Sequence, residues 1–92
     1  MAILTMFKLS GDPDELLRIA REELGPVVDE TAPANGRIAS TIARTDAGLM
    51  IANVWEDQEG MRRTAERVGP IARERGMPEQ EDWHLYEVLD RA

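Results

Sequence analysis

Two side chains near the end of the chain could carry out acid–base chemistry. His84 is the only histidine of the sequence and Tyr86 is its only tyrosine. An imidazole titrates near neutral pH, so His84 could act as a general base on a phenol or an enol. Tyr86, together with Asn53, could then hydrogen-bond the oxyanion that forms. The sequence therefore predicts three catalytic residues, His84, Tyr86 and Asn53, acting on an ionisable organic ligand.

Four further side chains are expected beside these three. Cβ atoms alternate between the two faces of a strand, so residues of matching parity point to the same side of a sheet. This parity predicts that the catalytic candidates share the helix-covered side with four ligand-binding residues, Thr5, Phe7, Ser40 and Trp55. Hydroxyl, amide and indole groups in an apolar layer are typical of a pocket for a planar aromatic ligand. The alternative is that His84 and Tyr86 lie on an edge strand, partly in solvent or bonded to backbone groups.

The sequence lacks the residue patterns that several other kinds of chemistry require. The sequence has no cysteine, only one histidine and no glycine-rich phosphate loop. Thiolate sites, multi-histidine metal sites and nucleotide loops are therefore not expected, and we predict neither a metal nor a cofactor. Ser10 and Ser40 lack the glycine pattern of a nucleophile elbow, which argues against a serine hydrolase.

The amino-acid composition limits the classes of partner that the chain is expected to bind. The 11 basic and 18 acidic side chains give a net charge of −7, which repels phosphate backbones and anionic headgroups. Neither nucleic acid nor a membrane is therefore an expected partner. Hydrophobic residues make up 42% of the chain, which is typical of a globular protein rather than a disordered one. The absence of cysteine and of a secretory signal pattern predicts a cytoplasmic location.

The first half of the chain contains a strand pattern followed by a helix pattern. An apolar run rich in strand-forming residue types predicts a strand over residues 2–9. Asp12 is expected to cap a helix in which Pro13 occupies the first position and Glu15 completes a capping box. Apolar residues then recur every three or four positions, and the helix is expected to end within residues 33–36.

The second half repeats this order. Strands are expected over residues 37–44 and 49–55, joined by a hairpin turn. Asp57 is expected to cap a second helix that stops at residues 76–78, and the last strand is expected over residues 83–89. The alternation predicts two β-α-β halves in tandem.

A repeated Gly-Pro pair supports this duplication. Gly25-Pro26 and Gly69-Pro70 lie 44 residues apart, and at that shift strand falls on strand and helix on helix. Each proline is expected to kink or restart its helix because it removes an amide donor. The pattern predicts a single α+β domain over residues 1–92 with a ferredoxin-like β-α-β-β-α-β order. In this fold a four-stranded antiparallel sheet carries both helices on one face.

The central strand indicates a second copy of the chain. Residues 49–55 are apolar at nearly every position, whereas a strand with water on one face should alternate apolar and polar residues. Two helices can cover one face only, so the other face needs a partner. A homodimer formed through this face would bury Leu4, Met6, Met50, Ala52, Val54, Trp83 and Leu85.

The passage from strand to helix resembles a known family. The segment from Met50 to Glu59, with Val54-Trp55-Glu56-Asp57 leading into the helix, is similar to the antibiotic biosynthesis monooxygenase-like dimeric α/β-barrel proteins. The resemblance implies a homodimer, a ligand pocket between each sheet and its own helices, and oxygenation of aromatic polyketide-type ligands without a cofactor.

Two alternatives stand beside this resemblance. The haem-degrading branch of the family fits poorly, because Phe7, Thr64 and Glu74 fall near the positions of its pocket asparagine, its tryptophan and its haem-binding histidine. The other alternative is a non-catalytic structural or stress-related dimeric barrel with no open pocket. A cavity between sheet and helices would argue against it.

Overall fold

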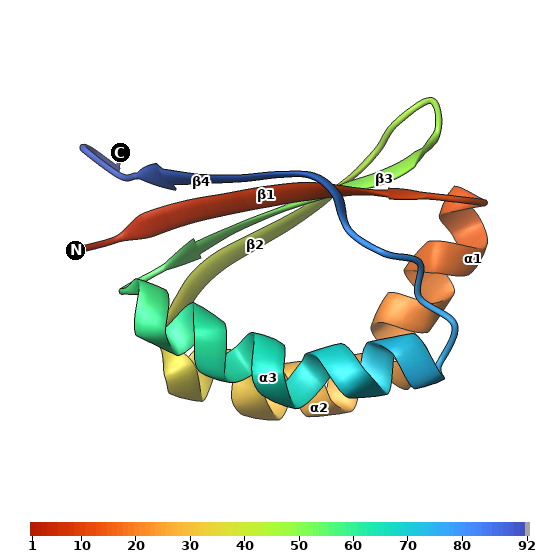
Figure 1. Cartoon of the computed structure of the whole chain (residues 1–92), viewed down its shortest axis with the longest axis horizontal. Helices are drawn as coiled ribbons and strands as arrows, with labels where there is room; N and C mark the ends of the chain where they lie inside the picture. The colour runs from red at the N-terminus through yellow and green to blue at the C-terminus, as the bar shows by residue number, and fades with distance from the viewer. Residues whose placement is uncertain (92) are drawn as a thin grey trace.

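The computed structural model describes residues 1–91, which form one sheet with helices packed on one side (Figure 1). The strands are β1 (Ile3–Ser10), β2 (Arg37–Arg44), β3 (Gly48–Trp55) and β4 (Glu81–Glu87). Their order in the sheet is β2-β3-β1-β4, and every neighbouring pair is antiparallel. The predicted ferredoxin-like α+β fold is confirmed. The last strand begins and ends two residues earlier than predicted.

The helical segments occupy the predicted regions, with one difference. The first region divides into α1 (Pro13–Arg18), a π-helical segment η1 (Ile19–Glu23), α2 (Gly25–Thr31) and a short 3₁₀ turn η2 (Pro33–Asn35). The restart at Gly25 confirms the expected effect of the first Gly-Pro pair. The second pair does not break its helix, because α3 (Gln58–Glu74) continues through Pro70. Gly69 has no Cβ to clash with the proline ring, so it can stay helical there.

The two expected N-caps differ in the structure. Asp57 Oδ1 accepts a hydrogen bond from the Gly60 amide at 2.7 Å, which confirms the cap of α3. Asp12 stands at the N-cap of α1, but its side chain makes no capping bond, so the predicted capping box is wrong. Glu15 instead accepts a hydrogen bond of 2.6 Å from the Arg18 guanidinium. This bond lowers the pKa of Glu15 and raises that of Arg18.

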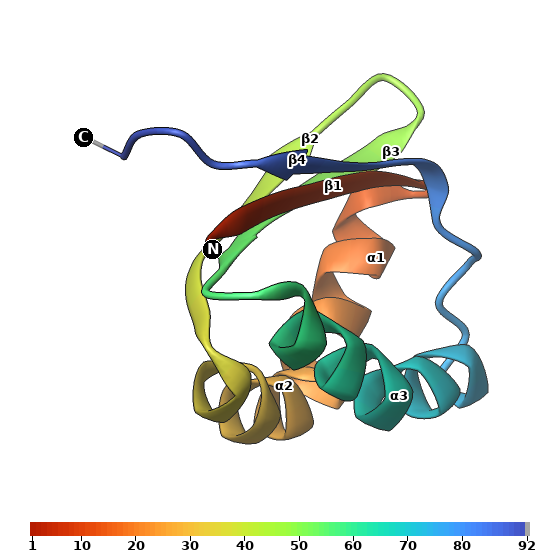
Figure 2. The same cartoon turned by 60° about the vertical axis from the view of Figure 1, so that its left-hand side comes forward.

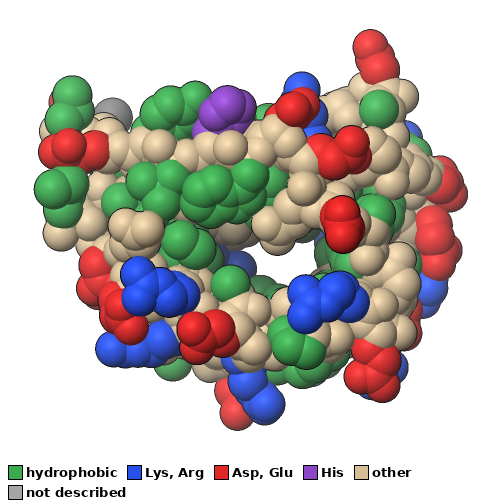
Figure 3. Space-filling view, in the orientation of Figure 1, with side chains coloured by type: hydrophobic (Ala, Val, Ile, Leu, Met, Phe, Trp, Pro, Cys, Tyr) green, Lys and Arg blue, Asp and Glu red, His purple; other side chains and the backbone are tan. Residues whose placement is uncertain are grey.

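The buried core is divided into two clusters. Ile3, Ala32 and Trp55 form one cluster, and the other consists of Leu9, Leu16 and Leu49. The two clusters lie at opposite ends of β1, and each joins the sheet to the first helical region. The turned view in Figure 2 shows the helices separated from the middle of the sheet. The space-filling view in Figure 3 is hollowed at this place.

The far side of the sheet has no helix over it (Figures 1 and 2). We call this side the outer face. Five of the seven residues predicted for it lie there and are half-buried in the single chain: Leu4, Met6, Met50, Ala52 and Val54.

The placement of Trp83 and Leu85 on the outer face is wrong. Leu85 packs against the cluster of Ile3 and Trp55, and Trp83 faces the helices. In β4 the apolar pair turns inward while the more polar neighbours turn outward, as burial of apolar surface favours. The β1–β4 register sets these sides directly: Leu85 is opposite the inward-facing Thr5, so the parity assumed from the first half does not carry over to β4.

Within residues 1–91, no helix is both long enough and apolar enough to cross a bilayer.

Candidate functional site

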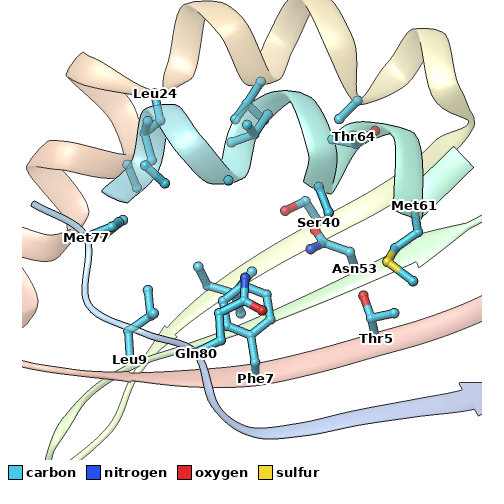
Figure 4. Close-up of a pocket in the computed structure, with 18 of the residues that line it drawn as sticks. Thr5, Phe7, Leu9, Leu24, Ser40, Asn53, Met61, Thr64, Met77 and Gln80 are labelled. Carbon is cyan, nitrogen blue, oxygen red and sulfur yellow. The ribbon is translucent and has the colours of Figure 1, made fainter. Parts of the chain in front are cut away.

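A cavity of about 280 Å³ separates the sheet from the helices. It lies against the middle of the sheet, between the two core clusters, and β1, β2 and β3 supply one wall. Met61, Thr64 and Val68 of α3 form the opposite wall, and Met77 and Gln80 of the following loop complete one end. Figure 4 shows these side chains converging from both layers. Ligand pockets have volumes of roughly 300–1,000 Å³, so the cavity is near the lower limit of that range.

Five of the seven predicted site residues line this cavity: Thr5, Phe7, Ser40, Asn53 and Trp55. Thr5 and Phe7 alternate along β1 with the outer-face residues Leu4 and Met6, as strand parity requires. Ser40 and Asn53 are partners across the β2–β3 pair and approach the cavity together (Figure 4). The binding and catalytic roles assigned to these residues stay predictions.

His84 and Tyr86 lie on the opposite side of the sheet, so the prediction that they face the helices is wrong. In the antiparallel register His84 is opposite Met6 and Tyr86 is opposite Leu4, both of which are outer-face residues. Their rings stack with centroids 5.8 Å apart and planes inclined by 10°. Both side chains are exposed, on an edge strand. The alternative of partly solvated edge-strand residues therefore describes them, and His84 cannot reach a ligand inside the cavity.

Thr5 and Trp55 form a fixed part of the wall. The Trp55 Nε1–H donates to Thr5 Oγ1 at 3.2 Å, and the two residues are only 5% and 3% exposed. A buried indole N–H normally finds an acceptor, and here the threonine on the neighbouring strand provides it. These two residues therefore shape the cavity, while the Thr5 hydroxyl proton is still available to a ligand.

Thr64 is a buried polar residue of the wall that the sequence did not reveal. Its hydroxyl donates to the Gly60 carbonyl at 3.0 Å and accepts from Asn35 Nδ2 at 3.2 Å. A threonine within a helix pattern gives no sign of such a role, because its partner Asn35 is far away in sequence. Both bonds are structural: the bond from Asn35 joins α3 to η2, and the bond to Gly60 lies within α3.

Asn53 differs from Thr64 in that one of its buried polar atoms, Oδ1, has no partner. Its Oδ1 atom is buried, and among residues 1–91 no group donates to it. Leaving a buried acceptor unpaired costs about 1–3 kcal/mol. Most buried polar groups in proteins are paired, so this orphaned oxygen is an exception. Asn53 is a candidate contact for a bound molecule because its side chain lines the cavity.

The lining contains one charged side chain, Arg37, which the sequence reasoning also missed. No aspartate, glutamate, histidine or tyrosine is among the described residues that line the cavity. Groups of three or more His, Asp or Glu side chains suited to a metal ion are also absent from residues 1–91. The site therefore offers hydroxyl, amide and guanidinium groups for hydrogen bonding, and no general base.

No protein-family model and no curated protein matches the chain by sequence. Several solved structures match it by fold. SnoaB from Streptomyces nogalater, described as a cofactor-independent oxygenase, has 21% identity and a TM-score of 0.61, with 98% of this chain and 93% of SnoaB covered.

Two more matches are candidate antibiotic biosynthesis monooxygenases. The one from Nitrosomonas europaea has 14% identity and a TM-score of 0.66, with 96% of this chain and 90% of that protein covered. The one from Chloroflexus aurantiacus has 16% identity and a TM-score of 0.64, with 100% and 97% covered. The chain therefore has the fold of the antibiotic biosynthesis monooxygenase-like proteins, as the sequence resemblance implied.

Proposed function

We propose that the cavity binds a small, planar, aromatic or polyketide-like molecule, which molecular oxygen then oxidises without a cofactor. The observation that carries this proposal is the cavity itself, whose largely apolar lining includes the carboxamide of Asn53. Its apolar side chains suit the faces of a ring system, and its few polar groups suit ring hydroxyls or carbonyls. The fold shared with SnoaB, a cofactor-independent oxygenase, agrees with this assignment.

The lining restricts how the chemistry could proceed. Without a general base in the cavity, the ligand must ionise by itself, as an acidic phenol or enol does. Hydrogen bonds donated by the Asn53 Nδ2 amide and the Thr5 hydroxyl would stabilise the resulting anion, which is the electron-rich form that reacts with oxygen. Oxidation of a ring methylene to a carbonyl takes one oxygen atom from O₂ and releases the other as water. The ligand supplies all four electrons, so the balance requires no external reductant.

The same lack of a base favours one second candidate function. A protein that binds the aromatic molecule without converting it needs shape and hydrogen bonds only, and the cavity offers both. The structural alternative with no open pocket lacks support, because the interior is not filled by Phe7 and Trp55. Oxygen consumption distinguishes the catalyst from the binding protein.

Thermal unfolding with quinols and flavonoid-like compounds tests the binding step, since a ligand that binds only the folded state raises the melting temperature. Ala72→Phe should abolish the rise, because Ala72 lines the cavity and a phenyl ring would fill it. Ala47→Phe adds the same ring in the exposed β2–β3 hairpin and should keep the rise.

An oxygen electrode then tests catalysis. Oxygen uptake with a stabilising compound, lost in Ala72→Phe and kept in Ala47→Phe, would support the oxygenase. Stabilisation without uptake would leave the binding protein as the function. The absence of any stabilising compound would contradict both.

We also propose that two copies pair through their outer faces. The apolar side chains of this face have no cover in the single chain, and monomers seldom expose such patches. A cytoplasmic location remains part of the proposal, supported by the cysteine-free composition.

A further inference from the structure

A bulge in β2 changes which side chain enters the cavity. From Arg44 back to Ala39, β2 pairs regularly with β3, and Ser40 lies opposite Asn53 and Ala39 opposite Val54. Regular pairing would next put Ile38 opposite Trp55. The register shifts there, so Arg37 is opposite Trp55 instead. Because directly opposed residues share a face, the extra residue turns Arg37 into the cavity and Ile38 away from it.

The exchange of Arg37 for Ile38 in the cavity wall opposes the usual burial of apolar side chains. Ile38 is left 39% exposed, while Arg37 is half-buried and lines the cavity. Without the bulge, the isoleucine would extend the apolar lining and the arginine would lie in solvent. Bulges that redirect a side chain are frequent beside functional sites, so the cost in apolar burial points to a use for the cation.

Arg37 also has no acidic partner in the described part of the chain. Arg18, Arg44, Arg62, Arg63 and Arg75 each lie within 4 Å of a carboxylate oxygen, although these pairs are largely exposed. Among residues 1–91 of a chain with 18 acidic and 11 basic side chains, Arg37 forms no such ion pair. Arg21, Arg67, Arg73 and Arg91 form none either, but of these five arginines only Arg37 lines the cavity. A cation that remains unpaired amid this excess of carboxylates is available to an anionic ligand.

We propose that the cavity selects aromatic ligands that carry an acid group, with the carboxylate bound by Arg37 and a ring hydroxyl or carbonyl bound by Asn53. This inference rests on the proposed function and adds the charge of the ligand to it. An arginine binds a carboxylate through two parallel hydrogen bonds, which fixes the orientation of the ring as well. The net charge of −7 repels anions in general, so a local cation is needed to hold one.

The positions of the two groups set the length of the ligand. Arg37 lies beside Trp55, and Trp55 is two residues along β3 from Asn53. Two residues of a strand span about 7 Å. A naphthalene ring with substituents at opposite ends matches this separation, which makes 6-hydroxy-2-naphthoate a suitable probe. 2-Naphthol is the matched compound without the acid group.

Calorimetric titration of both probes tests the proposal. 6-Hydroxy-2-naphthoate should bind more tightly than 2-naphthol by about tenfold or more, the usual effect of a hydrogen bond to a charged group. Arg37→Gln should remove this preference and leave the affinity for 2-naphthol within about twofold. Arg37→Lys should keep part of the preference, because it keeps the charge without the planar fork. Arg67→Gln removes an exposed charge on the far side of α3 and should change nothing.

The other possible results contradict different parts of the proposal. Equal affinity of the two probes, or a preference that survives in Arg37→Gln, would overturn the role of Arg37 and leave the binding cavity intact. If Arg37→Gln weakens both probes equally and lowers the melting temperature of the ligand-free protein, the arginine has a structural role instead. If neither probe binds nor any quinol, the proposed function itself fails.

Discussion

Asn53 gives the sharpest contrast between stability and function at the scale of single residues. Because its buried Oδ1 has no partner, Asn53→Leu should leave the melting temperature unchanged or raise it. The same substitution should weaken the binding of a stabilising quinol or of 6-hydroxy-2-naphthoate, since leucine offers no hydrogen bond. Thermal unfolding with and without the probe measures both effects.

Thr64→Val is the control for this prediction. Thr64 lines the same cavity but has both of its hydrogen bonds satisfied within the chain. The valine should therefore cost about 1 kcal/mol of unfolding free energy, because it leaves Asn35 Nδ2 without its acceptor. If Asn53→Leu destabilised the protein by more than Thr64→Val, Asn53 would be a structural residue and no longer a candidate for ligand binding.

The position of His84 allows a prediction about how the oxygenation rate depends on pH. Any oxygenation should follow the ionisation of the ligand, so the rate should rise with pH through the ligand's own pKa. His84→Ala should leave that profile unchanged, because His84 lies on the other side of the sheet from the cavity. Oxygen uptake measured across a pH series provides the test. A pH profile that changes in His84→Ala would contradict the structural placement.

Strand parity predicted part of this site and failed where the strand register differs from the one that the repeat implies. Thr5, Phe7 and Asn53 were placed correctly because β1 and β3 pair without interruption. His84 was misplaced because β4 meets β1 in a register that leaves no mark in the sequence: His84 is opposite Met6, whereas the 44-residue repeat of the Ser40–Asn53 pair would put it opposite Leu9. Arg37 was missed for the same reason, since the bulge beside it arises only when β2 meets β3.

At the scale of elements, the two N-caps offer a matched pair of variants. Asp57→Ala should lower the free energy of unfolding by about 0.5–2 kcal/mol, because its side chain holds the Gly60 amide at the start of α3. Asp12→Ala should cost clearly less, because Asp12 occupies the N-cap of α1 without a capping bond. Chemical denaturation of both variants measures the difference. Equal losses would mean that both aspartates cap their helices.

Element boundaries were largely predictable, because their signals are local. The span of β2 and the cap at Asp57 follow from residue types within a few positions. The restart at Gly25 follows from the proline after it, which lacks an amide proton. The continuity of α3 through Pro70 was not predicted. A helix packed along a neighbour can keep its direction at a proline, and α3 has α2 and η2 beside it.

At the scale of the whole molecule, the cavity and the bare face have a common origin. A chain of 92 residues has few apolar side chains to distribute, and here they form two small clusters rather than one continuous core. The space between the clusters becomes the cavity, and the apolar side chains beyond the sheet are left without cover. Such a chain buries little surface for its size, so an additional interface would stabilise it. A dimer supplies that interface without closing the cavity.

The size of the outer face makes the dimer testable. Four strands of about eight residues present a face of roughly 19 Å by 26 Å, or about 500 Å² for each copy. Two such faces bury about 1,000 Å² in total, which is near the lower limit for a stable interface. Light scattering at high concentration should therefore give twice the 10.3 kDa of one chain. A mass of 10.3 kDa at every concentration would contradict the dimer.

Substitution at the centre of the face locates the interface. Ala52 lies opposite Met6 on one side and Thr41 on the other, so Ala52→Glu would bury an unpaired carboxylate between the copies. We expect this variant to be monomeric, whereas Gln58→Glu, which adds the same charge on α3, should stay dimeric. Thr41→Glu tests the same face at a side chain that is exposed in the single chain, so its folding should be unaffected. If both glutamate variants of the outer face remained folded dimers, the copies would have to meet through another surface.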